Sequence, residues 1–158
     1  MTLPDDIYSQ SILELAAAMP RTARLAAPQA TARAHSKLCG STVTVDLAME
    51  GDLVTDYGQS VKACLLGQSA ASVMGREIVG STAAELRAVG SAMRRMLKEH
   101  GPPPSGKWSD LAVLEPVRDY KARHASTLLV FDAVEDAISQ IQAKGAAGAR
   151  ARRSEQHV

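Results

Sequence analysis

Alternating hydrophobic and polar residues predict a β-hairpin in the first half of the chain. Between residues 42 and 49 every second residue is hydrophobic, which places one set on the same face of a strand: Val43, Val45, Leu47 and Met49. A turn sequence follows at 50–52, and residues 53–61 again favour β-structure. We therefore predict an antiparallel hairpin, with residues 29–37 as an additional edge strand.

Hydrophobic residues at helical spacing predict one helix before this hairpin and a short one after it. The first spans residues 6–19, with Asp5 or Asp6 as its N-cap and Pro20 as its stop. The second spans residues 67–79 and is rich in alanine, serine and glycine, which suits close packing on a sheet.

Two longer helices are predicted in the second half of the chain. Thr82 and Glu85 form a capping box that opens the first of them. Three consecutive prolines at 102–104 cannot continue this helix, so residues 101–108 are predicted to form a surface loop. A short helix or turn is expected at 111–117. The last helix is expected over residues 120–143.

Length and composition indicate one folded α+β domain. The 158 residues correspond to about one domain, and 46% of them are hydrophobic. Only 3% are aromatic, so the core depends on aliphatic residues and alanine. We expect a single domain over residues 1–144 and a disordered basic tail over residues 145–158, where the hydrophobic periodicity ends.

Charge and hydropathy argue against nucleic-acid and membrane partners and for a cytoplasmic location. Eighteen basic and 17 acidic side chains give a net charge of +1, which offers no electrostatic argument for nucleic-acid binding. No stretch approaches the roughly 18 to 20 apolar residues that span a bilayer, and the acidic N-terminus is unlike a signal peptide. We expect a cytoplasmic protein, without membrane or nucleic-acid partners, whose thiols stay reduced.

Cys39 and Cys64 are the two cysteines of the chain. A hairpin centred on Gly51 pairs residue 49 with residue 53, and each outward step moves both strands by one, so Cys39 would face residue 63. The two thiols are therefore expected at the same end of the sheet. Cys64 also precedes a predicted helix N-terminus, whose partial positive charge favours thiol reactivity.

Three interpretations of these cysteines remain open on the residues alone. Two reactive thiols at one place suit a metal, an iron–sulfur cluster or a transferred sulfur atom. Cysteines in such a protein are more commonly small buried side chains. A disulfide is the third interpretation, which a reducing compartment disfavours. The sequence contains no CxxC, HExxH, Walker or Gly-x-Ser-x-Gly motif.

The order of three central segments is a specific signature. A Cys-Gly turn at 39–41 precedes the hairpin turn at 51–56, and a second cysteine opens an Ala- and Ser-rich segment at 64–74. This order resembles the iron–sulfur cluster assembly scaffold family that includes IscU, SufU and the N-terminal domain of NifU. The resemblance covers about residues 7–143. It implies a SufE/NifU-like fold, in which a small antiparallel sheet of about three strands packs against helices. The loop at 101–108 lies where the SufU branch has an insertion, which makes SufU the closest branch.

The resemblance also implies a set of ligands, from which this chain departs at two positions. Ser41 stands where family members have an aspartate, and either Ser126 or Ala125 stands where they have a third cysteine. The implied ligands to the metal or cluster are Cys39, Cys64 and His124, with Ser41 and Ser126 as weak candidates. The implied cofactor is a [2Fe–2S] cluster or iron, and zinc can take its place.

We therefore expect an accessory protein of iron–sulfur cluster assembly and not an enzyme. It is a scaffold or carrier that binds a cluster through Cys39 and Cys64, with a cysteine desulfurase and cluster acceptor proteins as partners. The alternative is a sulfur acceptor that receives a persulfide from the desulfurase without holding a cluster. A third interpretation is a family member that retains only partner binding. Arg118, Lys121 and Arg123 either contact an acidic partner or form a solvated helical face, which is the commoner case.

Overall fold

The computed structural model describes residues 9–37 and 40–156. Three strands, paired in the order in which they occur in the chain, form one antiparallel sheet with helices before and after it, which confirms the predicted α+β class and the three-stranded sheet. The elements in chain order are α1 (Gln10–Ala17), β1 (Ala30–His35), β2 (Thr42–Glu50), β3 (Leu53–Lys62), α2 (Leu65–Glu77), α3 (Ala83–Glu99), the 3-10 segments η1 (Gly106–Asp119) and η2 (Lys121–Arg123), and α4 (His124–Gln156). Among these residues no helix combines the length and the hydrophobicity of a membrane-spanning segment.

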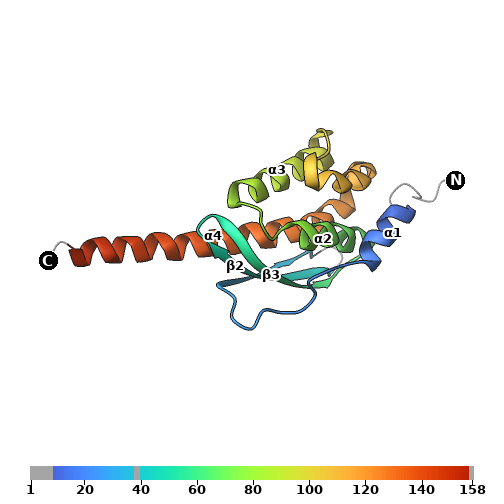
Figure 1. The fold of residues 1–158 in the computed structure, drawn as a ribbon. Helices are drawn as coiled ribbons and strands as arrows, with labels where there is room; N and C mark the ends of the chain where they lie inside the picture. Colours follow the sequence, from blue (N-terminus) through green and yellow to red (C-terminus); the bar gives the residue numbers. More distant parts are fainter. Residues whose placement is uncertain (1–8, 38–39, 157–158) are drawn as a thin grey trace.

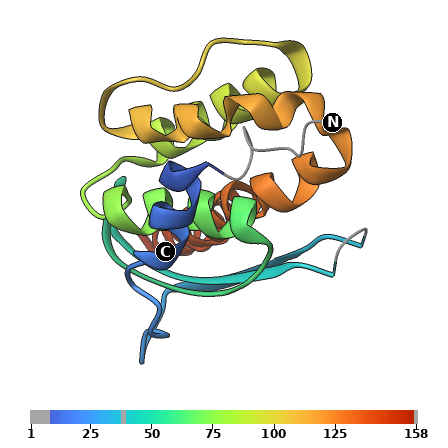
Figure 2. The same ribbon diagram turned by 90° about the vertical axis from the view of Figure 1, so that its right-hand side faces the viewer.

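The elements form three layers. Helices α2 and α4 pack on one face of the sheet, α2 against β3 and α4 against β1 and β2. Helix α3 and segment η1 cover the opposite side of this helical layer, as Figures 1 and 2 show. Figure 1 also shows that the far end of α4 extends well beyond the sheet. The sheet thus lies on one outer side of the molecule and α3 on the other.

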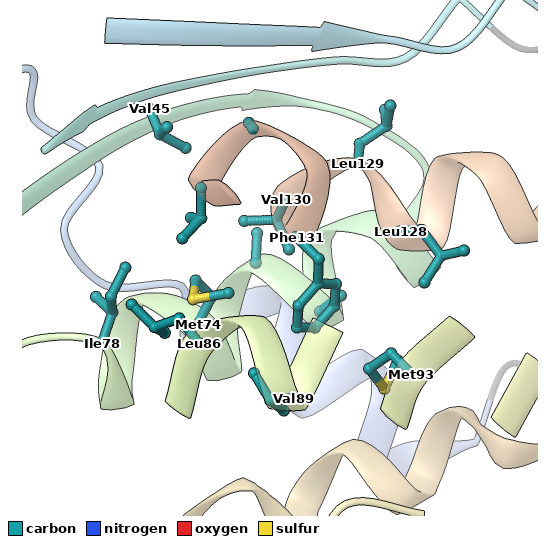
Figure 3. Close-up of a cluster of buried hydrophobic side chains, with 14 of the residues drawn as sticks. Val45, Met74, Ile78, Leu86, Val89, Met93, Leu128, Leu129, Val130 and Phe131 are labelled. Carbon is teal, nitrogen blue, oxygen red and sulfur yellow. The ribbon is translucent and has the colours of Figure 1, made fainter. Parts of the chain in front are cut away.

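The core fills the space between these layers. The alternating residues of β2 that we predicted to face inward are buried, because one face of the strand lies under the helices. Figure 3 shows Val45 of β2 above side chains of α2, α3 and α4, among them Met74, Met93 and Phe131. The mostly aliphatic composition is therefore accommodated by close packing of helices on a sheet.

The register of the hairpin differs from the predicted one. Thr42 pairs with Lys62, whereas counting outward from Gly51 would pair it with Ser60. The turn is tighter than assumed, with Glu50 opposite Leu53, and a β-bulge between Ala48 and Met49 shifts the pairing by one further residue. Cys64 therefore lies two residues beyond the last strand pair, at the end of the sheet where β2 begins.

The helix boundaries differ from the sequence prediction mainly at the ends of the chain. Ser9 caps α1, its hydroxyl accepting a hydrogen bond from the Ile12 N–H at 3.4 Å, so neither Asp5 nor Asp6 is the N-cap. Asp5 and Asp6 lie outside the described residues. The predicted cap at Thr82 is confirmed, because the Thr82 hydroxyl accepts a hydrogen bond from the Glu85 N–H at 3.1 Å.

Helix α4 begins and ends later than predicted. It runs from His124 to Gln156, and so continues through much of the segment that we expected to be a disordered tail. That segment is rich in alanine and arginine, which have high helix propensity even where no hydrophobic stripe is present. The boundary of the single domain at residue 144 stays a prediction.

The segment between α1 and β1 crosses the outer face of the sheet and is anchored at Asp46. The carboxylate of Asp46 is buried and accepts hydrogen bonds from the Arg24 guanidinium, the Leu25 N–H and the Thr31 hydroxyl. The hydrogen bond from Arg24, assisted by those from Thr31 and Leu25, lowers the pKa of Asp46, although burial opposes this shift. The same segment approaches β3 so closely that a Cβ at Gly58 would overlap the Ala23 carbonyl oxygen.

Candidate functional site

Cys64 lies at the junction between the sheet and the first helix that covers it. It is the N-cap residue of α2, two residues after the end of β3, and its side chain is half-buried. Its carbonyl oxygen accepts the hydrogen bond from the Gln68 N–H that begins the helix, at 2.9 Å. The thiol therefore stands at a helix N-terminus, where the helix dipole favours a negatively charged group.

Ser126, in the first turn of α4, contacts this thiol. The Cys64 Sγ lies 3.6 Å from the Ser126 Oγ, although the two residues are 62 positions apart in the chain. The Ser126 hydroxyl also reaches the Arg123 carbonyl oxygen at 3.3 Å. Since a hydroxyl has one proton, it accepts a hydrogen bond from a neutral thiol while it donates to Arg123, and it can donate instead to a thiolate.

Gly67 allows α2 and α4 to meet closely enough for this contact. A Cβ at Gly67 would lie 2.9 Å from the Ser126 carbonyl oxygen and 2.8 Å from the Ala63 Cβ. A hydrogen atom at this position thus lets the first turn of α2 lie against the first turn of α4. Sequence reasoning did not identify Gly67 as part of the site, and its place one turn after Cys64 is the signal that could have done so.

The Cys64–Ser126 contact also bears on where the third family cysteine aligns. The resemblance allowed either Ser126 or Ala125 at that position. Ser126 is buried and faces Cys64, whereas Ala125 is exposed on another side of the helix. The geometry therefore favours Ser126 as the equivalent position.

His124 is turned away from this contact. Its Nε2 lies 3.0 Å from the Val117 carbonyl oxygen and 3.1 Å from that of Arg118, so this nitrogen carries a proton and donates to the backbone of η1. Two residues along an α-helix are about 200° apart, which places His124 and Ser126 on opposite sides of α4. The structure thus brings together Cys64 and Ser126 and does not bring His124 to them.

The other two predicted ligands belong to the turn between β1 and β2. Cys39 lies outside the described residues. Ser41, just before β2, is buried. The turn is closed by hydrogen bonds of 2.9 Å from the Ser36 N–H to the Ser41 carbonyl and from the Gly40 N–H to the Ser36 carbonyl. Because His35 pairs with Thr42, and Thr42 with Lys62, this turn and Cys64 are at the same end of the sheet.

The donor atoms fit a metal or cluster only in part. A closed tetrahedral zinc site or a [2Fe–2S] cluster takes four protein ligands. Over residues 9–37 and 40–156, no three or more His, Cys, Asp or Glu side chains are grouped so that they could hold a metal ion. In this part of the chain Cys64 provides the one thiol, and the neighbouring Ser126 hydroxyl is a weaker ligand.

This combination of fold and site defines a class of protein. A three-stranded antiparallel sheet, covered on one face by helices and with a half-buried cysteine where β3 passes into α2, has the fold of NifU-like N-terminal domains. Comparison with known proteins makes this assignment specific.

A NifU-like protein (N-terminal) from Brucella abortus, described as nitrogen-fixing, is 61% identical to this chain. Its crystal structure matches with a TM-score of 0.87 over 89% of this chain and 97% of that one. A putative SUF-system scaffold, FiSufU from Fervidobacterium islandicum, is 20% identical, with a TM-score of 0.78 over 85% of this chain and 98% of that one. The iron–sulfur cluster assembly scaffold protein IscU of Thermotoga maritima is 22% identical over 135 residues, which are 85% of this chain and 94% of that protein. No family model matches the sequence.

The chain belongs to the IscU, SufU and NifU family, as a relative of the NifU N-terminal domain. The resemblance inferred from the sequence is thereby confirmed. The similarity to FiSufU supports the shared fold, and the assignment to the SufU branch stays a prediction.

Proposed function

We propose that this protein is a scaffold or carrier of iron–sulfur cluster assembly, on which iron or a [2Fe–2S] cluster is held for transfer. Cys64 is the central ligand and Cys39 the second. Ser126, Ser41 and His124 are weaker candidates, and zinc can occupy the same donors. The partners would be a cysteine desulfurase, which supplies sulfur, and cluster acceptor proteins in the cytoplasm. In this role the protein is an accessory factor and not an enzyme.

The observation that carries this proposal is the position of Cys64. Its thiol is half-buried at the N-terminus of α2, beside the first turn of α4, in a chain 61% identical to a NifU-like domain. The thiol stands at the first turn of a helix and can be reached from solvent, which suits a ligand that binds and releases its cargo. The cluster is thus the cargo of the protein, held temporarily by few ligands.

Anaerobic reconstitution with iron and sulfide tests this role. Visible absorbance and the iron content per chain should show a cluster in the wild-type protein, and both should be lost in Cys64→Ala and reduced in Cys39→Ala. Gln68→Ala, which changes a side chain in the same turn and leaves both thiols, is the matched control. A wild-type protein that forms no chromophore, or a chromophore that persists without both cysteines, would contradict the scaffold role.

A second function is favoured by the hydroxyl of Ser126 in place of a thiol. A sulfur acceptor needs one accessible nucleophile, and Cys64 meets this need with fewer ligands than a cluster requires. In this reaction the Cys64 thiolate attacks the outer sulfur of the desulfurase persulfide. A new S–S bond forms at Cys64, the S–S bond of the donor breaks, and the desulfurase cysteine leaves as a thiolate. No external oxidant is required.

Mass spectrometry distinguishes the acceptor from the scaffold. After incubation with a cysteine desulfurase and cysteine, the acceptor role predicts one added sulfur atom on the peptide that contains Cys64, together with faster turnover of the desulfurase. Both effects should be lost in Cys64→Ala. Faster turnover without an adduct, or an adduct confined to Cys39, would exclude Cys64 as the acceptor.

A further inference from the structure

A basic hollow lies on the side of α4 opposite the Cys64 site. It has a volume of about 530 Å³ and lies between the end of α3, the end of η1 and the first turn of α4. Its lining consists of Leu97, Lys98, His100, Arg118, Lys121, His124 and Ala125. We define these seven residues as the basic hollow.

The charged side chains that line the hollow are all basic. Lys98, Arg118 and Lys121 carry permanent charges, and no acidic residue is part of the lining. One of the three, Arg118, has a long ion pair of 3.9 Å with Glu115, while Lys98 and Lys121 are exposed. The concentration of charge is local, because the whole chain has a net charge of only +1. The hollow therefore favours anions more than the nearly neutral surface of the whole chain does.

Three chain segments contribute to this concentration of charge. Lys98 and His100 come from the end of α3, and Arg118 and Lys121 come from the 3-10 segments some 20 residues later. The N-terminus of α4 adds a partial positive charge at His124 and Ala125. Sequence reasoning identified Arg118 and Lys121 but gave His100 no role, because the contribution of α3 depends on its packing against α4.

We propose that the basic hollow binds an acidic segment of a protein partner. Five of the seven lining residues have basic or imidazole side chains, and only Leu97 and Ala125 are apolar residues. Lys98 and Lys121 are long exposed cations, which suit carboxylates on the surface of another protein and favour fast, salt-sensitive association. Carboxylates in series along a segment would meet the cations of α3 and of the 3-10 segments together.

The location makes this surface relevant to the thiol, and in this respect the inference deepens the proposed function. Ala125 lines the hollow and the next residue, Ser126, contacts the Cys64 thiol. A protein bound at the hollow would thus lie against the same first turn of α4 that contacts the Cys64 thiol on its other side. Docking itself requires only the basic residues and does not depend on Cys64.

Fluorescence anisotropy with a labelled hexaglutamate peptide tests the proposal on the full chain at low ionic strength. The double variant Lys98→Glu with Lys121→Glu should weaken binding by roughly tenfold, since each exposed charge pair contributes modestly. The matched control is Arg33→Glu with Lys144→Glu, which makes the same change of charge at exposed positions away from the hollow. It should leave the affinity within about a factor of two.

Two further measurements fix the interpretation. Cys64→Ala should bind the peptide like the wild-type protein. If this variant loses sulfur or cluster transfer but still binds the peptide, then docking at the basic hollow and the chemistry at Cys64 are separate properties. Raising the salt concentration should weaken binding because ions screen exposed charges. Equal weakening in both double variants would overturn the proposal. It would also be overturned if inorganic tripolyphosphate bound the hollow more tightly than the peptide, since a phosphate ligand would then be its occupant.

Discussion

Replacing Ser126 by cysteine should restore a metal-binding thiol next to Cys64. The Cys64 Sγ and the Ser126 Oγ are 3.6 Å apart. Two thiolates on one tetrahedral zinc ion, with Zn–S bonds of about 2.3 Å, are about 3.8 Å apart. The two side chains are therefore already spaced as neighbouring ligands, and Ser126→Cys changes the chemistry of the second donor with little change in its position.

The size of the effect follows from the energy of a structural zinc site. Four ligands together provide about 10–16 kcal/mol of apparent binding free energy at neutral pH, which is about 3 kcal/mol per ligand. A gain of this size corresponds to an affinity roughly 100-fold higher than that of the wild-type protein. Ala125→Cys adds the same thiol one residue away, on the side of α4 that lines the basic hollow, and should give no such gain.

Competition for zinc with a chromophoric chelator under reducing conditions measures this difference. Ser126→Cys should remove zinc from the chelator at concentrations where the wild-type protein and Ala125→Cys do not. Cys64→Ala in the Ser126→Cys background should abolish the gain, because the new thiol would lose its partner. The reasoning is refuted if Ser126→Cys binds zinc no better than the wild-type protein, or if Ala125→Cys gains as much.

The remaining predictions concern the packing that positions the site and the charge that anchors the outer segment. In urea titrations, Gly67→Ala should lower the free energy of unfolding by about 1–3 kcal/mol, because the new methyl group meets the Ser126 carbonyl and weakens the Cys64–Ser126 contact. The control Gly145→Ala adds a methyl group in open space on a helix and should be neutral or stabilising. The pKa of Asp46 is lower in the folded state than in the unfolded chain, so ionised Asp46 stabilises the fold at pH values above the ordinary aspartate pKa of about 4. This contribution is lost as the pH falls through the pKa of Asp46 in the folded protein. Asp46→Asn should flatten the acid limb of stability against pH in urea titrations, and an unchanged acid limb would contradict the assigned role of Asp46.

Local patterns predicted the elements well and their exact pairing less well. The alternation along β2 identified its buried face, because alternation depends only on which side of one strand is covered. The hairpin register could not be obtained in this way, since the bulge between Ala48 and Met49 leaves no signature in hydrophobic periodicity. The cap of α1 was misplaced for a similar reason, as Asp5, Asp6 and Ser9 are all good caps and only the structure selects among them.

The site depended on contacts that no local pattern encodes. Cys64 was identified from the resemblance and from its place before a helix. Its contact with Ser126 could not be predicted, because it depends on how α2 packs against α4, and the two residues are 62 positions apart in the chain. His124, the chemically stronger candidate, is instead held by the backbone of η1. Donor chemistry alone therefore favours His124 as a ligand beside Cys64, whereas the geometry places the weaker donor, Ser126, next to the thiol.

The Ser126 hydroxyl beside the Cys64 thiol affects how readily a bound cluster or sulfur atom would be passed to another protein. A closed site with four strong ligands holds its metal tightly, which benefits a structural centre and slows release to another protein. With Ser126 in the place of a cysteine, a cargo bound at Cys64 as we propose would be held by fewer strong bonds, while the hydroxyl still hydrogen-bonds the sulfur. The same change that lowers affinity thus favours handing over a cluster or a sulfur atom. The Ser126→Cys variant that binds zinc more tightly should accordingly release its cargo to an acceptor more slowly than the wild-type protein.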